Sequence, residues 1–304
     1  MVATPKVVVA ANPTAGRGSA GKLIGRADRI LTELHVEHEI RVSTSADDLE
    51  KIARAAAEEG AEIVAALGGD GSISAAANGI LGTGAALAAL PAGTGDDFAK
   101  TIGAGKFDAA VRLLANPKLC SVDVVRISAG ATVRHFVNIA GAGFDSEVNE
   151  TANAMTVNLG STGTYILAVL KTLSRFTPAR FVIAVDDRTI ELDAMLAVVG
   201  SGISYGGGMK VLPGASLIDG VLDVCIVEAL GKGAFLRAFP RVFTGSHTTH
   251  PKIQMHRGRR ITMEANRRLQ VYADGERIGP LPAIFDVLPA ALPVVVGPNA
   301  KGIR

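Results

Sequence analysis

The fold is decided by one stretch of the chain, residues 62–80, which reads EIVAALGGDGSISAAANGI. Its apolar run, Ile63 to Leu67, is typical of a strand that is buried on both faces of a sheet. Three glycines around a single carboxylate, Asp70, follow this strand, and the residues up to Ile80 then continue as a helix. A glycine-rich turn between a strand and a helix lets the chain pass close to a ligand, so the stretch predicts an α/β unit with a binding site.

The same pattern is repeated on either side of this stretch. Upstream, the run Val7 to Ala11 precedes a helix with apolar residues between Leu23 and Leu34, and the run Ile40 to Val42 precedes a helix that Ser45 is suited to cap. Downstream, Ala85 to Leu90 forms another apolar run. Strands and helices that alternate with short links predict a mostly parallel sheet covered by helices, with ligands at the carboxyl ends of the strands.

Two further turns follow strands of this unit. The first, Asn12 to Gly18, reads NPTAGRG, and the other, Pro91 to Ala99, reads PAGTGDDFA. Backbone N–H groups in such turns attract anions, as does the positive end of the following helix. The first turn matches neither the phosphate loop nor the dinucleotide fingerprint, so a plain tight turn stays an alternative. In the second, Thr94 can donate a hydrogen bond to a phosphate, and we expect Asp96 and Asp97 to cap the next helix.

The chain changes character after about residue 122. Pairs of strands follow one another, Asp123 to Ser128 with Val133 to Ile139 and Arg180 to Val185 with Thr189 to Val199, and one helix ends before Pro178. This pattern predicts a β-rich, largely antiparallel second unit. Near the end, Val294 to Val296 can return as a last strand of the first unit. We therefore expect residues 1–122 and 290–304 to form one domain and residues 123–289 the other, with the ligand cleft between them.

Composition excludes several classes of protein. The 304 residues include 31 Lys and Arg against 29 Asp and Glu, which is far from the basic balance of dedicated nucleic-acid binders. Cys120 and Cys225 are too few for a disulfide framework, and the first residues show no secretion signal, so we expect a cytoplasmic protein. Residues 71–95 carry no charge, but their six glycines predict a helix, a turn and a strand rather than a transmembrane segment.

Taken in this order, the motifs resemble the catalytic domain shared by diacylglycerol kinases, sphingosine kinases and ceramide kinases, and the resemblance runs nearly end to end. In that family an NPxxGxG-type loop, a GGDGT loop and a GTxNDFA segment bind the nucleotide. Asn12 to Gly18, Gly68 to Ser72 and Gly93 to Ala99 match these segments. The resemblance implies that ATP is contacted by Asn12, Pro13, Thr14, Ala15, Gly16, Thr44, Gly68, Gly69, Asp70, Gly71, Ser72, Gly93, Thr94 and Asp97.

The resemblance extends into the second unit. The segment from Asn138 to Asp145 is similar to the family's glycine-rich GFD segment. Ser216 to Asp223 is similar to a segment through which bacterial members bind a structural Mg²⁺, and the matching ligands are Ser216, Asp219 and Val221. Asp274-Gly275-Glu276 matches the DGE motif that supplies a carboxylate to the active site. Without the resemblance, the segments at residues 216–223 and 274–276 would be interpreted as simple turns.

The function that the resemblance implies is transfer of the ATP γ-phosphoryl group to a lipid hydroxyl, with diacylglycerol as the leading substrate. Phosphoryl transfer depends on positioning and on neutralisation of charge, so Asp70 is the candidate for the Mg²⁺ network and Glu276, or else Asp274, for the base. A lipid substrate requires transient peripheral association with a membrane surface. The arginines between Arg257 and Arg268 are usually a solvated face but can also hold anionic headgroups. A homodimer is a further expectation.

Two departures from the family pattern keep other functions open. Ser72 replaces a threonine and keeps the hydroxyl, whereas Asp96 replaces an asparagine and adds a negative charge near the phosphates. A kinase of a soluble substrate, as in NAD kinases and phosphofructokinases, shares the GGDG motif, but the chain lacks a clear NNE motif and a TxDND motif. The extra charge at Asp96 also allows a catalytically silent protein that binds a lipid or a nucleotide.

Overall fold

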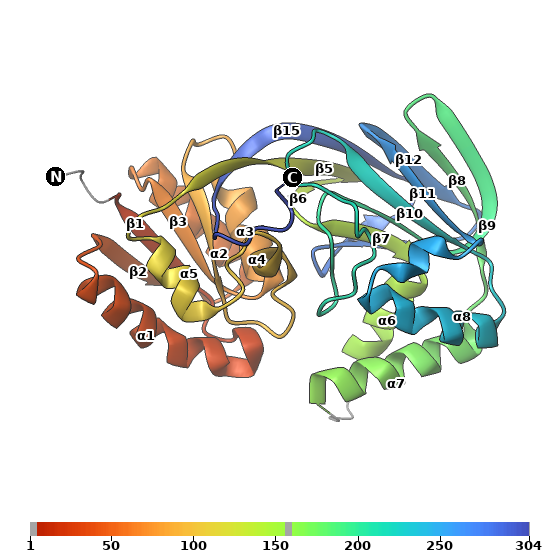
Figure 1. The fold of residues 1–304 in the computed structure, drawn as a ribbon, viewed down its shortest axis with the longest axis horizontal. Helices are drawn as coiled ribbons and strands as arrows, with labels where there is room; N and C mark the ends of the chain where they lie inside the picture. Colours follow the sequence, from red (N-terminus) through yellow and green to blue (C-terminus); the bar gives the residue numbers. More distant parts are fainter. Residues whose placement is uncertain (1–4, 156–159, 304) are drawn as a thin grey trace.

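The computed structural model describes residues 5–155 and 160–303, without the side chains of residues 17, 152, 153 and 160–166. Two units lie next to each other, and the chain passes from the first to the second and back (Figure 1). In the first unit, parallel strands lie in the order β2-β1-β3-β4. These strands are β1 Val7–Ala11, β2 His38–Val42, β3 Ile63–Gly68 and β4 Ala86–Pro91.

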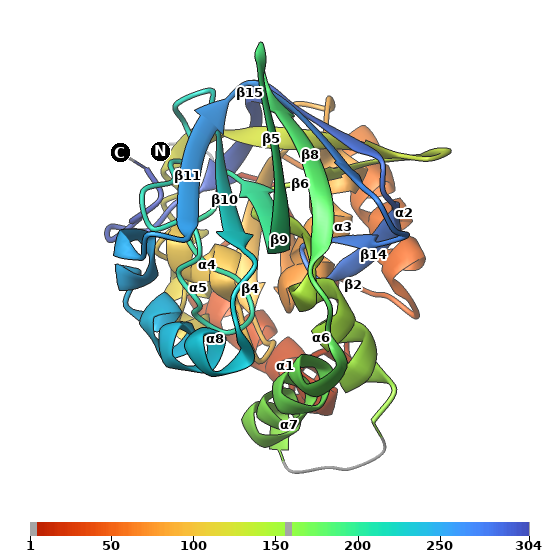
Figure 2. The same cartoon turned by 90° about the vertical axis from the view of Figure 1, so that its right-hand side faces the viewer.

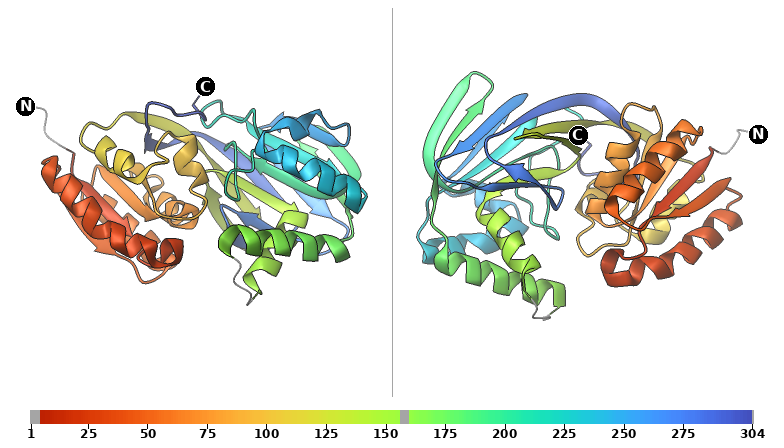
Figure 3. Two further views of the ribbon diagram at one scale, coloured as in Figure 1. Left: turned by 60° about the horizontal axis from the view of Figure 1, so that its bottom comes forward. Right: turned by 180° about the vertical axis from the view of Figure 1, so that it is seen from behind.

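Helices cover both faces of this sheet, which confirms the expected α/β unit. They are α1 Ser19–Glu33, α2 Ala46–Glu58, α3 Asp70–Ile80, α4 Asp97–Thr101 and α5 Phe107–Leu113, with a short 3-10 helix η1 at Ala15–Gly18. α1 and α5 pack on one face, and α2 and α3 on the other (Figures 1 and 3). As predicted, Ser45 caps α2, because its side chain accepts the N–H of Asp48 at 3.1 Å.

The second unit is antiparallel and rich in strands, as expected. Its strands are β5 Leu119–Ala129, β6 Thr132–Phe136, β7 Ile139–Gly143, β8 Ala179–Val185, β9 Arg188–Gly200, β10 Leu222–Glu228, β11 Ile253–Gly258, β12 Arg260–Ala265, β13 Gln270–Ala273, β14 Glu276–Pro280 and β15 Ala283–Val295. One core lies among the strands around Phe181 and Phe285, and another lies between the strands and the helices around Phe144 and Phe235. Figure 2 shows these helices gathered below the fan of strands.

The helices of the second unit are α6 Phe144–Asn153, α7 Gly160–Arg175 and α8 Lys232–Ala238, followed by the 3-10 helices η2 Phe239–Phe243 and η3 Ser246–Thr249. In the described residues, no helix combines the length and the apolar character that a bilayer crossing requires. The uncharged residues 71–95 form most of α3 and β4, in agreement with the sequence prediction.

One local prediction was wrong. The expected strand from Val133 to Ile139 is broken between β6 and β7, because the N–H groups of residues 137–139 donate to the carboxylate of Asp274 instead of joining one continuous ladder. Residues 216–223, which would be interpreted as a simple turn without the resemblance, have no hairpin in the structure. Gly220 donates its N–H to Asp123 at 2.7 Å, and the segment leads into β10 from an irregular path.

Two long strands, β5 and β15, join the two units. They pair with each other in an antiparallel manner along their length, and Val294 of β15 also pairs with Leu87 of β4, which confirms the predicted return of this segment to the first sheet. Val122 and Val124 belong to the core of the first unit, whereas Val125 begins the core of the second. The proposed boundaries therefore fall inside shared strands, where no loop separates the units.

Candidate active site

Three turns meet at the carboxyl edge of the parallel sheet. The first and second turns are joined by a hydrogen bond of 3.2 Å from Asn12 Nδ2 to Ser72 Oγ. The second and third turns touch through backbone, since a Cβ on Gly93 would lie 2.6 Å from the Cα of Gly69. Only glycine permits this approach. The residues expected to hold a nucleotide in these three turns are therefore close neighbours.

Asp70 connects the second turn to the third. Its Oδ1 accepts the N–H of Phe98 at 3.1 Å, so this carboxylate caps α4 from another part of the chain. Burial raises the pKa of Asp70, and the negative charges of Asp97 and Asp96 raise it further. A divalent cation would relieve this repulsion, and carboxylate oxygens are the ligands that Mg²⁺ prefers. The surroundings of Asp70 therefore fit the Mg²⁺ that accompanies ATP.

Asp96 and Asp97 do not cap α4, contrary to the sequence prediction. Asp96 occupies the cap position in the left-handed conformation, with φ of 51°, and its Oδ1 accepts the N–H of Gly93 at 2.9 Å. Asparagine could accept the same bond through its carbonyl oxygen, so the departure from the family pattern preserves this contact and adds charge. The buried Asp97 reaches into the second unit, where it accepts hydrogen bonds from Ser204 Oγ at 3.0 Å and from the N–H of Gly207 at 2.7 Å.

Glu276 approaches the second turn from the other unit. It begins β14, directly after the turn at Asp274-Gly275, and a Cβ on Gly71 would lie 3.7 Å from its Oε1. Burial raises the pKa of Glu276, and the positive charge of Arg134 opposes that shift. The Glu276 carboxylate therefore lies beside the turn that contains Asp70, on the opposite side of the boundary between the units.

Asp274 is engaged differently from Glu276. Its two carboxylate oxygens accept the N–H groups of Val137, Asn138 and Ile139 at 3.0, 3.2 and 3.0 Å. The side chain is buried, and this burial raises its pKa to about 7. With both oxygens occupied by backbone donors, Asp274 holds the β6–β7 turn against the turn that carries Glu276.

Arg134 is a further charged residue at this site. It lies on β6 and forms two hydrogen bonds to Glu50 of α2, at 2.8 and 3.3 Å. Next to it, Asn78 of α3 donates to the carbonyl of His135 at 2.8 Å and accepts the N–H of His135 at 3.1 Å. These bonds fix β6 against two helices of the first unit, with the guanidinium near Glu276.

An apolar pocket lies in the second unit, between the strands and the helices α6, α7 and α8. Phe144, Val169, Leu196, Phe235, Phe239 and Ile253 are among the side chains that line it. Two buried polar atoms that line it, Asp145 Oδ1 and His247 Nδ1, have no hydrogen-bond partner among the described residues. Burial raises the pKa of Asp145 to about 6. The pocket thus combines a largely apolar lining with two polar atoms available to a ligand.

A short loop connects this pocket to the three turns. Tyr205 and Met209 line the pocket, while Ser204 and Gly207 of the same loop donate to Asp97. Because the loop is held at both places, a ligand in the pocket lies next to a segment that is fixed to the third turn. The arrangement places an apolar binding volume beside an acidic, glycine-rich edge suited to a polyphosphate and its cation.

Known proteins share both units. Residues 6–127 match the family described as diacylglycerol kinase catalytic domain, and residues 138–296 match the YegS C-terminal NAD kinase beta sandwich-like domain. The chain is 34% identical over 294 residues to a protein of Mycobacterium tuberculosis named diacylglycerol kinase, an alignment that covers 95% of this chain and 94% of that one. A Bacillus subtilis protein of the same name is 28% identical, with 90% of each chain covered.

The chain belongs to the diacylglycerol kinase family.

The fold of this family is also found in a solved structure. A putative diacylglycerol kinase from Bacillus anthracis str. Sterne superposes with a TM-score of 0.78 at 24% identity, over 98% of this chain and 99% of that chain. Other relatives, including one from Salmonella heidelberg at 26% identity, are named probable lipid kinase YegS. The α/β unit followed by a β-rich unit is therefore the architecture of diacylglycerol kinase relatives.

In the segment predicted to bind a structural Mg²⁺, Asp219 lies beside an arginine. Asp219 accepts the N–H of Val221 at 3.2 Å through Oδ1, and its Oδ2 accepts a hydrogen bond from Arg257. Arg257 Nε also lies 3.5 Å from Asp223. No cluster of three or more His, Cys, Asp and Glu side chains suited to a metal occurs in residues 5–155 and 160–303. A guanidinium therefore pairs with the one carboxylate of the predicted set, and the assignment of Mg²⁺ to Ser216, Asp219 and Val221 stays a prediction.

The remaining residues predicted for the site are Thr44 and the arginines between Arg257 and Arg268. Thr44 follows β2 at the outer part of the same edge, and its hydroxyl donates to Asp48 at 2.9 Å. The arginines between Arg257 and Arg268 do not form one patch, because Arg257 and Arg260 pair with acidic residues at one end of β12 and Arg267 pairs with Glu147 at the other. Sequence reasoning missed Arg134, Glu50 and the pocket. The triple glycine before Met209 was the signal for the loop beside the pocket.

Proposed function

We propose that this chain is an ATP-dependent lipid kinase that transfers the γ-phosphoryl group to the hydroxyl of diacylglycerol, forming phosphatidic acid. One observation carries the proposal: Glu276 lies beside the Asp70 turn while an apolar pocket is tied to the third turn through residues 204–209. A kinase of a soluble substrate has no need for such a pocket. The lipid substrate is therefore favoured over NAD or a sugar phosphate.

In the proposed reaction, the three turns bind the triphosphate through their backbone N–H groups and the amino-terminal end of α3. Mg²⁺ held at Asp70 would supply neutralisation of the phosphate charge. Glu276 accepts the proton of the lipid hydroxyl. The hydroxyl oxygen of the lipid forms a bond to the γ-phosphorus, and the bond between that phosphorus and the bridging oxygen, which leaves with ADP, breaks. Asp274 acts as a positioning residue, because its oxygens are engaged by backbone donors.

The acyl chains are assigned to the apolar pocket, with Asp145 near the polar end of the lipid. Asp145 Oδ1 is buried without a hydrogen-bond partner among the described residues, so it can accept a hydrogen bond from the free hydroxyl group of a lipid. The proposed setting is the cytoplasmic surface of a membrane, where ATP and a lipid alcohol are both present. The homodimer expected from the sequence stays a prediction.

The test is an assay with labelled ATP and Mg²⁺ on diacylglycerol, monoacylglycerol, sphingosine, ceramide and NAD, with products separated by thin-layer chromatography. We expect labelled phosphatidic acid. Glu276→Gln should lower kcat by about 100-fold or more while ATP binding is retained, since a positioned base contributes about that factor. Glu264→Gln, at an exposed site on β12, should leave kcat unchanged.

The pH dependence of the reaction rate is a second test of Glu276 as the base. Glu276 must be deprotonated to accept a proton, and its pKa is raised by burial, so the rate should fall as the pH is lowered through that raised pKa. Phosphorylation of NAD but of no lipid would overturn the proposal. A fully active Glu276→Gln variant would overturn the assignment of the base alone.

A further inference from the structure

Two helices of the second unit present apolar side chains to solvent. On α7, Leu167 and Leu170 are 36% and 46% exposed, and they lie on one face with the exposed Lys171 and Ser174. This spacing of three, four and seven residues is one stripe of a helix. The opposite side of α7 is buried, and its Val169 lines the apolar pocket. The helix therefore has an apolar inner face and a partly apolar outer face.

The outer side of α8 and η2 is similar. Leu236 is 41% exposed and Phe243 is 48% exposed, while Phe235 and Phe239 point inward and line the pocket. α7 and α8 are in contact, because Lys232 donates a hydrogen bond to the carbonyl of Ser174. With the lower side of the molecule turned forward, both helices lie at the front of the second unit (Figure 3, left). We call the exposed side chains of Leu167, Leu170, Lys171, Leu236, Arg237 and Phe243 the α7–α8 face.

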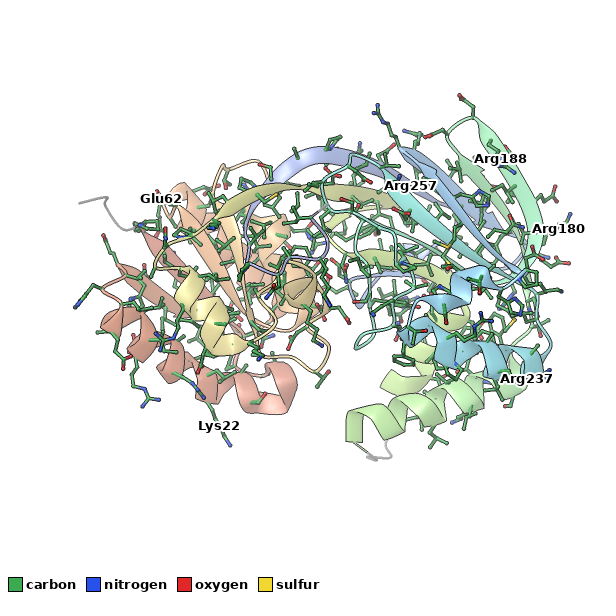
Figure 4. All side chains as sticks on the ribbon, in the orientation of Figure 1. Lys22, Glu62, Arg180, Arg188, Arg237 and Arg257 are labelled. Carbon is green, nitrogen blue, oxygen red and sulfur yellow. The ribbon has the colours of Figure 1, made fainter. Side chains whose placement is uncertain are left out.

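The sequence segments that form this face carry charges of one sign. The sequence contains no Asp or Glu between Thr151 and Val185, and none between Ala229 and Met263. Lys171 and Arg237 are exposed, and no described carboxylate pairs with either of them. Figure 4 shows Arg237 projecting from α8 away from the body of the molecule. Apolar side chains mixed with unpaired cations are the composition of surfaces that bind anionic bilayers.

We propose that the α7–α8 face docks on the surface of an anionic lipid bilayer. Leucine and phenylalanine side chains enter the boundary between headgroups and acyl chains, and Lys171 and Arg237 contact anionic headgroups. Because the inner sides of the same helices line the apolar pocket, docking places the pocket within one helix diameter of the lipid. The inference rests on the proposed lipid kinase function, since it identifies the surface from which the substrate is taken.

The experiment measures sedimentation of the full chain with vesicles of phosphatidylcholine alone or of equal parts of phosphatidylcholine and phosphatidylglycerol. Wild type should bind the anionic vesicles preferentially, and added salt should weaken binding. Lys171→Gln and Arg237→Gln should each lower the partition coefficient about fivefold. The double variant Leu170→Glu with Leu236→Glu should lower it by roughly tenfold or more. Leu119→Glu, at a 56% exposed leucine at the end of β5 next to the first unit, is the matched control and should bind as wild type.

A second measurement separates docking from catalysis. Each variant is assayed on a short-chain diacylglycerol that is soluble as a monomer, for which no docking is needed, and should phosphorylate it at the wild-type rate. Loss of vesicle binding with that rate retained supports the proposal. Unchanged vesicle binding in the charge and leucine variants overturns the proposal. A wild-type protein that is a dimer and a Leu170→Glu variant that is a monomer would also overturn it, because the face would then bind a second copy of the chain. Vesicle binding without any kinase activity keeps the docking surface and refutes the proposed function.

Discussion

At the scale of single residues, the site depends on how its charges are compensated. Asp70, Asp96, Asp97, Asp274 and Glu276 lie near one another, and burial raises the pKa of four of them. Backbone N–H groups compensate Asp70 and Asp274, whereas Glu276 faces a guanidinium that is shared with Glu50. The base of the proposed reaction is therefore a carboxylate whose proton affinity depends on a neighbouring side-chain cation.

Substitutions of the pair Arg134 and Glu50 should shift the pH profile in opposite directions. Arg134→Gln removes a positive charge that lowers the pKa of Glu276, so the acidic limb of kcat/KM should move to higher pH. Glu50→Gln removes a negative charge that raises this pKa, so the limb should move to lower pH. A shift in the same direction for both variants would show that the ion pair acts only by supporting the fold. Arg180→Gln, at a pair on the outer hairpin, should leave the profile unchanged.

At the scale of elements, the important contact is between turns. The strands β3 and β4 run side by side, so the turns that follow them emerge as neighbours, and only the absence of side chains at Gly69 and Gly93 lets their backbones touch. The third turn is also held by Asp70 from one side and by Asp97 from the other. The geometry offered to a triphosphate is therefore set by strand register and by two glycines.

The variant Gly93→Ala should weaken nucleotide binding. Its Cβ would lie 2.6 Å from the Cα of Gly69 and 2.7 Å from Asp96 Oδ1, and the first of these atoms is backbone that cannot rotate away. The second and third turns must separate, which should raise the Kd for ATP by about tenfold or more, because a displacement near one ångström is costly at such sites. Isothermal titration with ATP and Mg²⁺ measures this. Gly25→Ala, in open space on α1, should leave the Kd unchanged and increase stability by about 0.5–1 kcal/mol.

Elements such as these were predictable where the signal is local. The strand before Gly68, the cap at Ser45 and the helix up to Ile80 follow from apolar spacing and turn residues within about a dozen positions. The capture of residues 137–139 by Asp274 was not predictable, since it joins positions more than 130 residues apart through the pairing of β13 with β7. The same holds for Arg134 with Glu50, because nothing in either sequence neighbourhood indicates an ion pair across the two units.

At the scale of the whole molecule, the two units share the pair of strands β5 and β15. Their register shifts between Leu288 and Leu292, where Ala290 adopts a left-handed conformation with φ of 49°. Asp123 holds this irregularity, because its Oδ1 accepts the N–H of Ala290 at 2.8 Å and its Oδ2 accepts that of Gly220. The position where β5 and β15 pass from one hydrophobic core to the other is therefore fixed by the buried carboxylate of Asp123 and by Ala290, which has a strained backbone conformation.

Relief of this strain should stabilise both units together. Ala290→Gly removes the steric cost of the left-handed conformation, about 1 kcal/mol, and we expect the free energy of unfolding to rise by up to about that amount. Urea unfolding followed by two spectroscopic probes gives the measurement. Both probes should report a single transition shifted to higher urea, since the strands belong to both cores. Two separate transitions would contradict the shared-strand interpretation, and Ala234→Gly on α8 should instead destabilise the protein.

Residues 294–302 complete the first unit, which is built from the beginning of the chain. Val294 pairs with β4, the N–H of Gly297 donates to Ile102, and Gly302 exchanges hydrogen bonds with Thr101 and Leu217. During synthesis on the ribosome, the first unit consequently has one sheet edge unpaired until β15 has left the exit tunnel. A nascent chain stalled before β15 would expose that edge to other proteins, so translation through β15 is the step at which the first unit becomes protected.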